Sequence, residues 1–342
     1  MKNFLSLILL LFFSNFFLSQ TIQFVSSNSG SPLPQVFIYD VSGKIITESD
    51  IDGKINVDQL KPFQEKYILY YENYKIGEIT NNDLNKEILK LNDRVKNLEP
   101  LSIIDNTKAK FIYLKGNFNT NVTINGYTNA YADGMVTHVF DNQKKKYLYT
   151  VIDQYRVYKR TDVDYDNKIL ADDDFGNNLR ILTPKMLASN LSAYKKNSKD
   201  YTYNENSTTN KDVIELKATR FDDKIKKILG YWFTQAKADY ILSYDKESKR
   251  HIRDFIDARV LISVKIKRRV EPEFHQMKVY QNFYATELSY GNQELKTITK
   301  FNHYQSYYKN QYWNSDDFPK MTNVLNNFYK GKFEEKENKF GK

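Results

Sequence analysis

The sequence predicts a mainly β protein: an N-terminal Ig-like or prealbumin-like β-sandwich, followed by an α+β domain in which a few helices pack on a curved antiparallel sheet. In the first part of the chain, short alternating runs are separated by turn signals at spacings of roughly ten residues, which is typical of a small sandwich. In the rest, longer strand-like runs rich in tyrosine are broken by a few helical patterns. The 342 residues are enough for two domains, and 41% hydrophobic with 27% charged residues is a globular composition.

Residues 1–19 predict a cleaved signal peptide. Lys2 supplies a short positive region, and Phe4–Leu18 is nearly continuous apolar sequence. This run is shorter than the roughly 20 residues that a membrane-spanning helix needs. Cleavage is predicted after Ser19, although Phe17 is a poor match to the small residue expected near the cut. The alternative is an uncleaved anchor. The sequence therefore predicts an exported protein that is periplasmic, outer-membrane-associated or secreted.

Residues 20–91 are predicted to form the sandwich. Turn signals stand at Ser42-Gly43 and Asp52-Gly53. Between and around them lie four strand-like runs, Thr21–Ser26, Gln35–Tyr39, Lys54–Val57 and Tyr67–Tyr71. In the second run Val36 and Ile38 share one side, because successive side chains of a strand point to opposite faces.

Three segments of this region resemble the carboxypeptidase-regulatory-like domain of exported Bacteroidetes proteins, which include TonB-dependent receptors. They are Gly30-Ser-Pro32-Leu33-Pro-Gln-Val36-Phe-Ile38, Ser49-Asp50-Ile-Asp52-Gly53-Lys-Ile55 and Tyr67–Tyr74. The resemblance covers about residues 21–91 and implies an accessory β-sandwich with no catalysis of its own. The chain departs from the family pattern at Asn73, where Gly is usual, and Asn is the next-best residue for a left-handed backbone.

The acidic pair in Asp50-Ile-Asp52-Gly53 has two interpretations, a tight turn or a calcium loop. A calcium-binding EF-hand needs further oxygen ligands and a Glu at its twelfth position, where this chain has Lys61. The missing ligands favour the turn.

Residues 92–107 are predicted to be a linker, because this polar stretch contains Pro100 and separates two different strand patterns. Residues 108–342 then predict the antiparallel-sheet domain. Two long strands are expected around a turn at Asp141-Asn142, followed by a polar loop over Tyr201–Lys211. The expected strands are Thr123–Phe140, Lys146–Lys159, Val213–Ala218, Tyr231–Tyr244, Phe255–Lys267 and Met277–Tyr290.

Two helices are expected to cover this sheet. Residues 184–195 begin with Thr183-Pro184, an N-cap followed by a proline in the first turn. Residues 318–332 carry an apolar face and end near Gly331, a natural helix stop. This arrangement is similar to that of lipoprotein-carrier half-barrels at the level of fold alone.

One predicted strand ends in a basic cluster. Val260–Ile266 alternates apolar residues with Ser263 and Lys265, so one face is apolar and the other basic. One interpretation is a core strand with a solvated face. The other is an anionic partner, such as lipid phosphate or acidic glycan, contacted by Lys265, Lys267, Arg268 and Arg269.

A second candidate contact surface is the aromatic segment that contains Tyr307, Tyr308, Tyr312 and Trp313. Exposed aromatic side chains stack on sugars or anchor protein partners. Buried ones fill the core of a sheet, and the sequence favours the core because the aliphatic residues are few.

The sequence nominates no catalytic, cofactor-binding or metal-binding residue. The chain has no Cys, and its four His are not arranged as metalloprotease ligands. It contains no nucleophile elbow, dinucleotide fingerprint or phosphate-binding loop. A pair of catalytic carboxylates of the glycosidase type remains an alternative, because the two residues of such a pair can be far apart in sequence.

The function expected from these observations is a non-catalytic binding or adaptor module of the cell envelope, with a protein, glycan or lipid as ligand and no cofactor. The alternative is an envelope hydrolase that acts on glycan or peptidoglycan through unidentified carboxylates. Nucleic acid is not expected as a partner, because only ten of the 51 basic residues are Arg. No second apolar run is long enough to span a membrane, and the sequence leaves the oligomeric state open.

Overall fold

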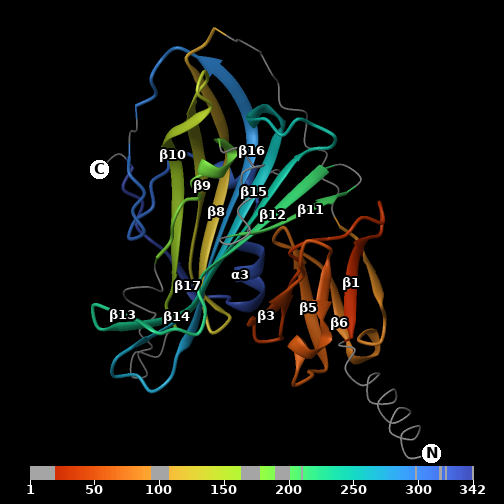
Figure 1. The fold of residues 1–342 in the computed structure, drawn as a ribbon. Helices are drawn as coiled ribbons and strands as arrows, with labels where there is room; N and C mark the ends of the chain where they lie inside the picture. The colour runs from red at the N-terminus through yellow and green to blue at the C-terminus, as the bar shows by residue number, and fades with distance from the viewer. Residues whose placement is uncertain are drawn as a thin grey trace, which may run out of the picture. The chain divides into compact units, whose positions relative to one another are not determined.

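The computed structural model describes residues 20–93, 108–162, 178–188, 201–208, 211–296, 299–315, 318–319 and 322–340 (Figure 1). The predicted signal peptide, most of the predicted linker and the later part of the helix expected at 184–195 lie outside the described residues. The chain divides into two compact units, one formed by most of the described residues up to 93 and the other chiefly by those from 108 onward.

The first unit is a β-sandwich. One sheet has the order β4-β1-β7 and the other the order β3-β2-β5-β6. Strand β1 pairs antiparallel with β4 and parallel with β7. The strands are β1 (Thr21–Ser26), β2 (Phe37–Tyr39), β3 (Ile45–Glu48), β4 (Lys54–Asn56), β5 (Lys66–Tyr71), β6 (Tyr74–Thr80) and β7 (Ile88–Leu91).

Side chains from both sheets of the first unit form a single buried cluster, as expected for a sandwich. Val36 and Ile38 belong to it, so the face predicted for them is confirmed. The turn predicted at Asp50 is also confirmed, because one carboxylate oxygen of Asp50 accepts the backbone N–H groups of Asp52 and Lys54. Asn73 has a φ of 67°, the left-handed conformation that its position was expected to need.

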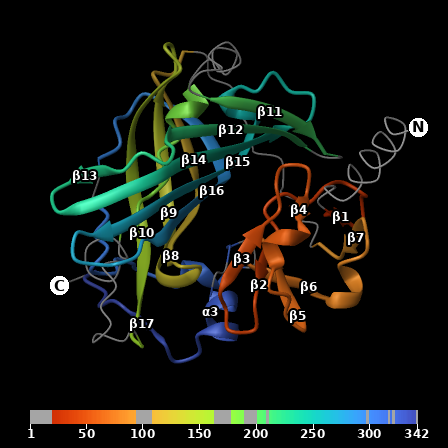
Figure 2. The same ribbon diagram turned by 60° about the horizontal axis from the view of Figure 1, so that its bottom comes forward.

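The second unit is built on one ten-stranded sheet whose described pairings are all antiparallel. Its order is β11-β12-β14-β15-β16-β8-β9-β10-β17, with β13 paired to β14. Figure 2 shows β9 and β10 running in a different direction from β12 and β14, as a strongly twisted and curved sheet requires. The strands are β8 (Phe111–Ile124), β9 (Tyr127–Asp141), β10 (Lys146–Arg160), β11 (Thr202–Ser207), β12 (Lys211–Phe221), β13 (Lys226–Ile228), β14 (Tyr231–Asp245), β15 (Phe255–Arg268), β16 (His275–Gly291) and β17 (Phe333–Glu335).

Two of the predicted segments were wrong. The single strand expected over Thr123–Phe140 is interrupted by a turn at Asn125-Gly126, which joins β8 to β9. Both turn residues have positive φ, 50° and 90°, and Asn-Gly is the preferred sequence for such a two-residue hairpin. The polar loop expected over Tyr201–Lys211 contains strand β11, because pairing with β12 orders a segment that has no apolar alternation of its own.

A β-bulge in β10 decides which side chains share a face. On β8 and β9 the even-numbered residues reach the main hydrophobic cluster, and we call this side of the sheet the core face. On β10 the pairing passes from Ile152–Val136 to Gln154–Met135, so Asp153 is an extra residue. After this bulge the parity is reversed: Tyr155 is on the core face and Arg156 is on the opposite face.

Among its described residues, the second unit contains little helical structure. The helix expected at 318–332 is shorter in the structure: α3 (Thr322–Phe328) has 7 residues, about two turns, and Val324 and Leu325 in it are buried. The described part of the segment 184–195 contains the short 3₁₀ helix η6 (Lys185–Ala188). Within the described part of the chain, no helix is both long enough and apolar enough to cross a membrane.

Candidate functional site

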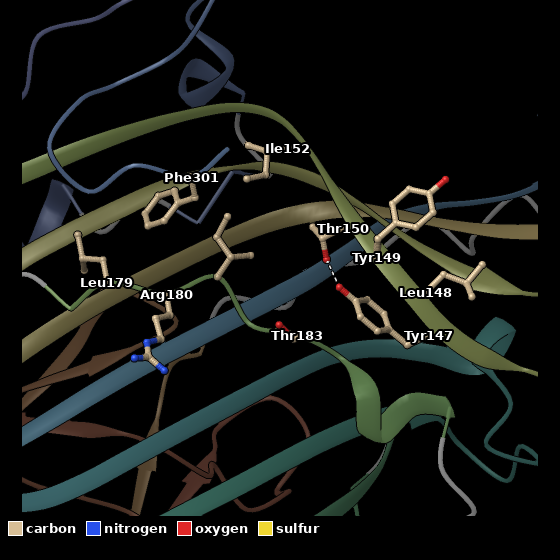
Figure 3. Close-up of a pocket in the computed structure, with 10 residues that line it drawn as sticks. Tyr147, Leu148, Tyr149, Thr150, Ile152, Leu179, Arg180, Thr183 and Phe301 are labelled. Atoms are coloured by element: carbon tan, nitrogen blue, oxygen red, sulfur yellow. Dashed lines mark hydrogen bonds between the residues drawn. The ribbon is translucent and has the colours of Figure 1, made fainter. Parts of the chain in front are cut away.

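An open pocket of about 450 Å³ lies on the core face of β10 (Figure 3). The extended segment that leads into η6 forms its second wall, and Phe301 closes one side. The wall is mostly apolar, and four of its residues carry a hydroxyl group: Tyr147, Tyr149, Thr150 and Thr183. The ten lining residues are Tyr147, Leu148, Tyr149, Thr150, Ile152, Leu179, Arg180, Ile181, Thr183 and Phe301.

The two walls are held by the same hydrophobic cluster. Leu179 and Leu182 are buried in the cluster of the sheet, while Ile181 between them is only half-buried. The backbone oxygen of Arg180 accepts a hydrogen bond of 3.1 Å from the side chain of Gln281 on β16. The side chain of Arg180 is exposed and donates to Asn178 at 3.0 Å, so its head group forms the rim of the pocket.

A chain of polar side chains leads from the pocket into the sheet. Tyr147 Oη lies 2.8 Å from Thr150 Oγ1, and Thr150 Oγ1 lies 2.7 Å from Nδ1 of His138. His138 and Thr150 are directly paired on β9 and β10. The imidazole is fully buried against Phe283, with a distance of 4.4 Å between ring centres. Its Nε2 atom has no hydrogen-bond partner.

Burial keeps His138 neutral. It lowers the pKa of this imidazole to about 3, since the charged form would lose its hydration. A residue with such a pKa is not suited to proton transfer near neutral pH. The His138–Thr150–Tyr147 chain therefore serves to fix the hydroxyl group that Tyr147 presents at the pocket wall.

The low pKa of His138 predicts a stability loss in acid. In the unfolded chain a histidine titrates near about 6.5, so below that pH the unfolded state binds a proton that the folded state rejects. The second unit is expected to lose about 1.4 kcal/mol per pH unit from this residue between pH 6.5 and the folded pKa. Urea unfolding at several pH values, followed by tryptophan fluorescence, measures the loss. His138→Gln should flatten the profile, and parallel profiles for the two proteins would contradict the assignment.

A buried ion pair occupies the opposite face of the sheet. Asp133 on β9 and Arg156 on β10 are directly paired, and the bulge places both on this face. Arg156 donates from Nη2 at 2.6 Å and from Nε at 3.0 Å to the two carboxylate oxygens of Asp133. The hydroxyl groups of Tyr131 and Tyr312 also donate to this carboxylate, at 2.6 and 2.7 Å. Asp133 is completely buried and Arg156 nearly so.

Aromatic side chains enclose the guanidinium of Arg156. Its central carbon lies 3.9 Å from the ring centre of Trp313 and 5.4 Å from that of Tyr158. Tyr158 accepts a hydrogen bond from Arg156 and donates one to Glu335 on β17. Burial by itself would lower the pKa of Arg156, but the bonds to Asp133 outweigh it and raise that pKa. The cluster therefore attaches the segment that contains Trp313, and strand β17, to strands β9 and β10.

This cluster contains most of the predicted aromatic contact residues. Tyr312 and Trp313 bind Asp133 and Arg156 directly, and Tyr308 packs edge-on against Trp313 at 5.0 Å. Tyr307 instead pairs its backbone with Tyr155 of β10 and packs its ring on the main cluster. These four side chains are partly buried, and each has a partner within the chain.

The four predicted basic residues lie at the turn between β15 and β16. Lys265 is half-buried on β15, and Lys267 donates to the backbone oxygens of Glu271 and Pro272, both at 3.1 Å. Arg268 ends the strand, and Arg269 is exposed in the turn. They do not lie at the pocket, and none of them belongs to the Asp133–Arg156 cluster.

Sequence reasoning missed His138, Thr150, Asp133 and Arg156 as interacting groups. The sequence does show a charged or polar residue within each of these aromatic strands. That pattern does not indicate which residue of another strand the polar side chain contacts. Among the described residues, no group of three or more His, Asp or Glu side chains is arranged to hold a metal ion.

No protein-family model matches the sequence, and no curated protein matches it. A solved structure described as "Lipid-protein interactions in lipovitellin" matches with 8% identity and a TM-score of 0.26. The match covers 56% of this chain and 27% of that chain, so this chain spans about a quarter of the length of the matched one. A TM-score this low carries no argument about fold or ligand.

Proposed function

We propose that this chain is a non-catalytic binding protein of the cell envelope that holds an apolar ligand in the pocket beside β10. The pocket carries the proposal. Its volume of about 450 Å³ is within the range of roughly 300–1,000 Å³ typical of small-molecule sites. Its lining includes the apolar side chains of Ile152, Leu179, Ile181 and Phe301, which come from three segments of the chain.

The polar groups of the pocket define the kind of ligand. Tyr147 and Thr150 place hydroxyl groups on one wall, and their mutual hydrogen bond fixes both. Such a site favours a ligand with an apolar body, such as an acyl chain or an aromatic ring, and one hydrogen-bonding group. The engagement of Tyr312 and Trp313 within the chain favours this carrier function over a role in which they dock a partner protein or glycan.

The proposal includes export of the chain and an accessory role for the first unit as a carboxypeptidase-regulatory-like sandwich. The rival function, a hydrolase of glycan or peptidoglycan, has no observation in its favour among the described residues. Turnover of such a substrate that is lost on changing one Asp or Glu would establish the rival.

Binding of cis-parinaric acid, a fluorescent fatty acid, tests the pocket. The full chain should bind this probe saturably, because burial of its acyl chain removes apolar surface from water. Ile181→Trp places a large ring in the pocket from a half-buried position and should weaken binding by at least about tenfold, because it fills the site. Near-ultraviolet circular dichroism would verify that the variant is folded.

Ile88→Trp is the matched control, since Ile88 is 54% exposed on β7 of the first unit and does not line the pocket. It should bind the probe as the unchanged chain does. The proposal fails if the probe does not bind saturably, or if Ile181→Trp binds it with unchanged affinity.

A further inference from the structure

Two hairpin turns lie side by side at one end of the large sheet. The β13–β14 turn is Leu229-Gly230, and the β15–β16 turn begins at Arg269. Strands β14 and β15 are paired up to Tyr231 and Arg268, and the backbone N–H of Arg269 donates to the oxygen of Gly230 at 3.0 Å. Figures 1 and 2 both show the β13 hairpin at the edge of the second unit. We call residues 224–230 and 267–270 the tip.

The tip exposes large aliphatic side chains. Leu229 is 93% exposed and Val270 is 86% exposed, and Ile228 and Ile225 are each about half exposed. Single exposed apolar residues are normal on a protein surface, but a group of them on adjacent loops marks a binding surface.

The backbone conformation at Leu229 indicates that this leucine does not stabilise the fold. Leu229 has a φ of 48° and Gly230 a φ of 84°, the pair of positive angles of a two-residue hairpin turn. Asn, Asp or Gly is favoured at the first of these positions, because a branched side chain is strained there. Almost complete exposure means that no burial compensates for the strain. Strain that folding does not explain points to function.

The charge of the tip is entirely positive. Its two segments contain six basic residues and no acidic residue: Lys224, Lys226, Lys227, Lys267, Arg268 and Arg269. The acidic residues that flank the two segments in sequence are Asp222, Asp223, Glu271 and Glu273. Asp223 accepts a hydrogen bond from the side chain of Gln235, and Glu271 accepts one from the backbone N–H of Arg268. Behind the turns, the ring of Trp232 lies 4.7 Å from Lys227 Nζ and 4.9 Å from Lys267 Nζ.

We propose that the tip docks on an anionic lipid bilayer, with Leu229 and Val270 inserted among the upper acyl chains and the six cations on lipid phosphates. Aliphatic side chains surrounded by Lys and Arg match the layered polarity of a membrane surface. Trp232, the second residue of β14 and in contact with Lys227 and Lys267, is of the residue type that favours the membrane interface. A nucleic acid or an acidic protein would use the cations but leave the aliphatic side chains in water. None of the tip residues lines the pocket, so this proposal is independent of the proposed function.

Because the chain has no cysteine, a single label can report on the tip itself. Val270→Cys in the full chain, labelled with the environment-sensitive dye NBD, is titrated with vesicles of equal parts phosphatidylcholine and phosphatidylglycerol. The emission should shift to the blue as the tip inserts, and vesicles of phosphatidylcholine alone should bind at least about tenfold more weakly. Ile88→Cys, labelled in the same way, should show no shift.

Substitutions in the labelled chain separate insertion from charge attraction. Leu229→Asn should weaken binding by about tenfold, since the apolar side chain is lost, while thermal stability stays equal or rises because Asn suits the turn. Arg269→Gln should weaken binding by about fivefold. The proposal is overturned if the dye does not shift, if neutral vesicles bind equally well, or if Leu229→Asn binds as before while Arg269→Gln does not, which would indicate a soluble polyanion.

Discussion

Asp133→Asn is expected to lower the free energy of unfolding of the second unit by about 3–5 kcal/mol, because it leaves a buried charge without its counter-ion. Arg156 is only 4% exposed, and both carboxylate oxygens of Asp133 accept its hydrogen bonds. The amide keeps the size of the side chain but supplies one acceptor oxygen and no charge. Urea unfolding followed by tryptophan fluorescence measures the loss, since both tryptophans, Trp232 and Trp313, belong to this unit.

The double variant Asp133→Asn with Arg156→Met is the control. Removing both charges avoids an unpaired ion, so it should be less destabilised than Asp133→Asn alone. A loss below about 1 kcal/mol for Asp133→Asn, the size of a surface ion pair, would show that water reaches this cluster.

Gly134→Ala is expected to destabilise the same unit by about 3 kcal/mol, through a clash at the bulge. A Cβ atom at this position would lie 2.2 Å from the backbone oxygen of Gln154 and 2.6 Å from Cε1 of Phe118. The backbone of β10 must therefore move away from β9 where the ion pair forms. The same urea unfolding experiment measures the effect.

Gly331→Ala is the control that distinguishes the effect of this clash from the effect of replacing a glycine where there is no clash. Gly331 has a φ of +73° and no atom within 4 Å of an added Cβ, so its replacement should cost only the strain of a left-handed residue, about 1 kcal/mol. Equal losses for the two variants would mean that β10 accommodates the added atom without cost.

The pocket and the tip form two separate sites on the same unit. The pocket is proposed to hold an apolar ligand, and the tip is proposed to place the protein on a lipid surface. Because the lining residues and the tip residues do not overlap, either variant series can fail without affecting the other.

The candidate sites were only partly predictable from sequence. The basic run that ends at Arg269 was singled out as an anionic contact, but its neighbour Leu229 was not, since the two turns come together only when β14 pairs with β15. The dense aromatic segment was also singled out. That Trp313 stacks on Arg156 depends on a contact between residues far apart in the chain.

Local patterns determined the fold class of this protein. Alternation of apolar residues and turn residues is a property of neighbouring positions, so the sandwich, the long antiparallel strands and the turn at Asp50 follow from the sequence alone. Tertiary structure decided which faces and partners those strands acquired. The extra residue Asp153 reverses the parity of β10, which moves Arg156 onto the face of Asp133 and leaves Tyr155 in the core. No local pattern encodes that reversal, because a bulge is set by the pairing of two strands and not by either strand alone.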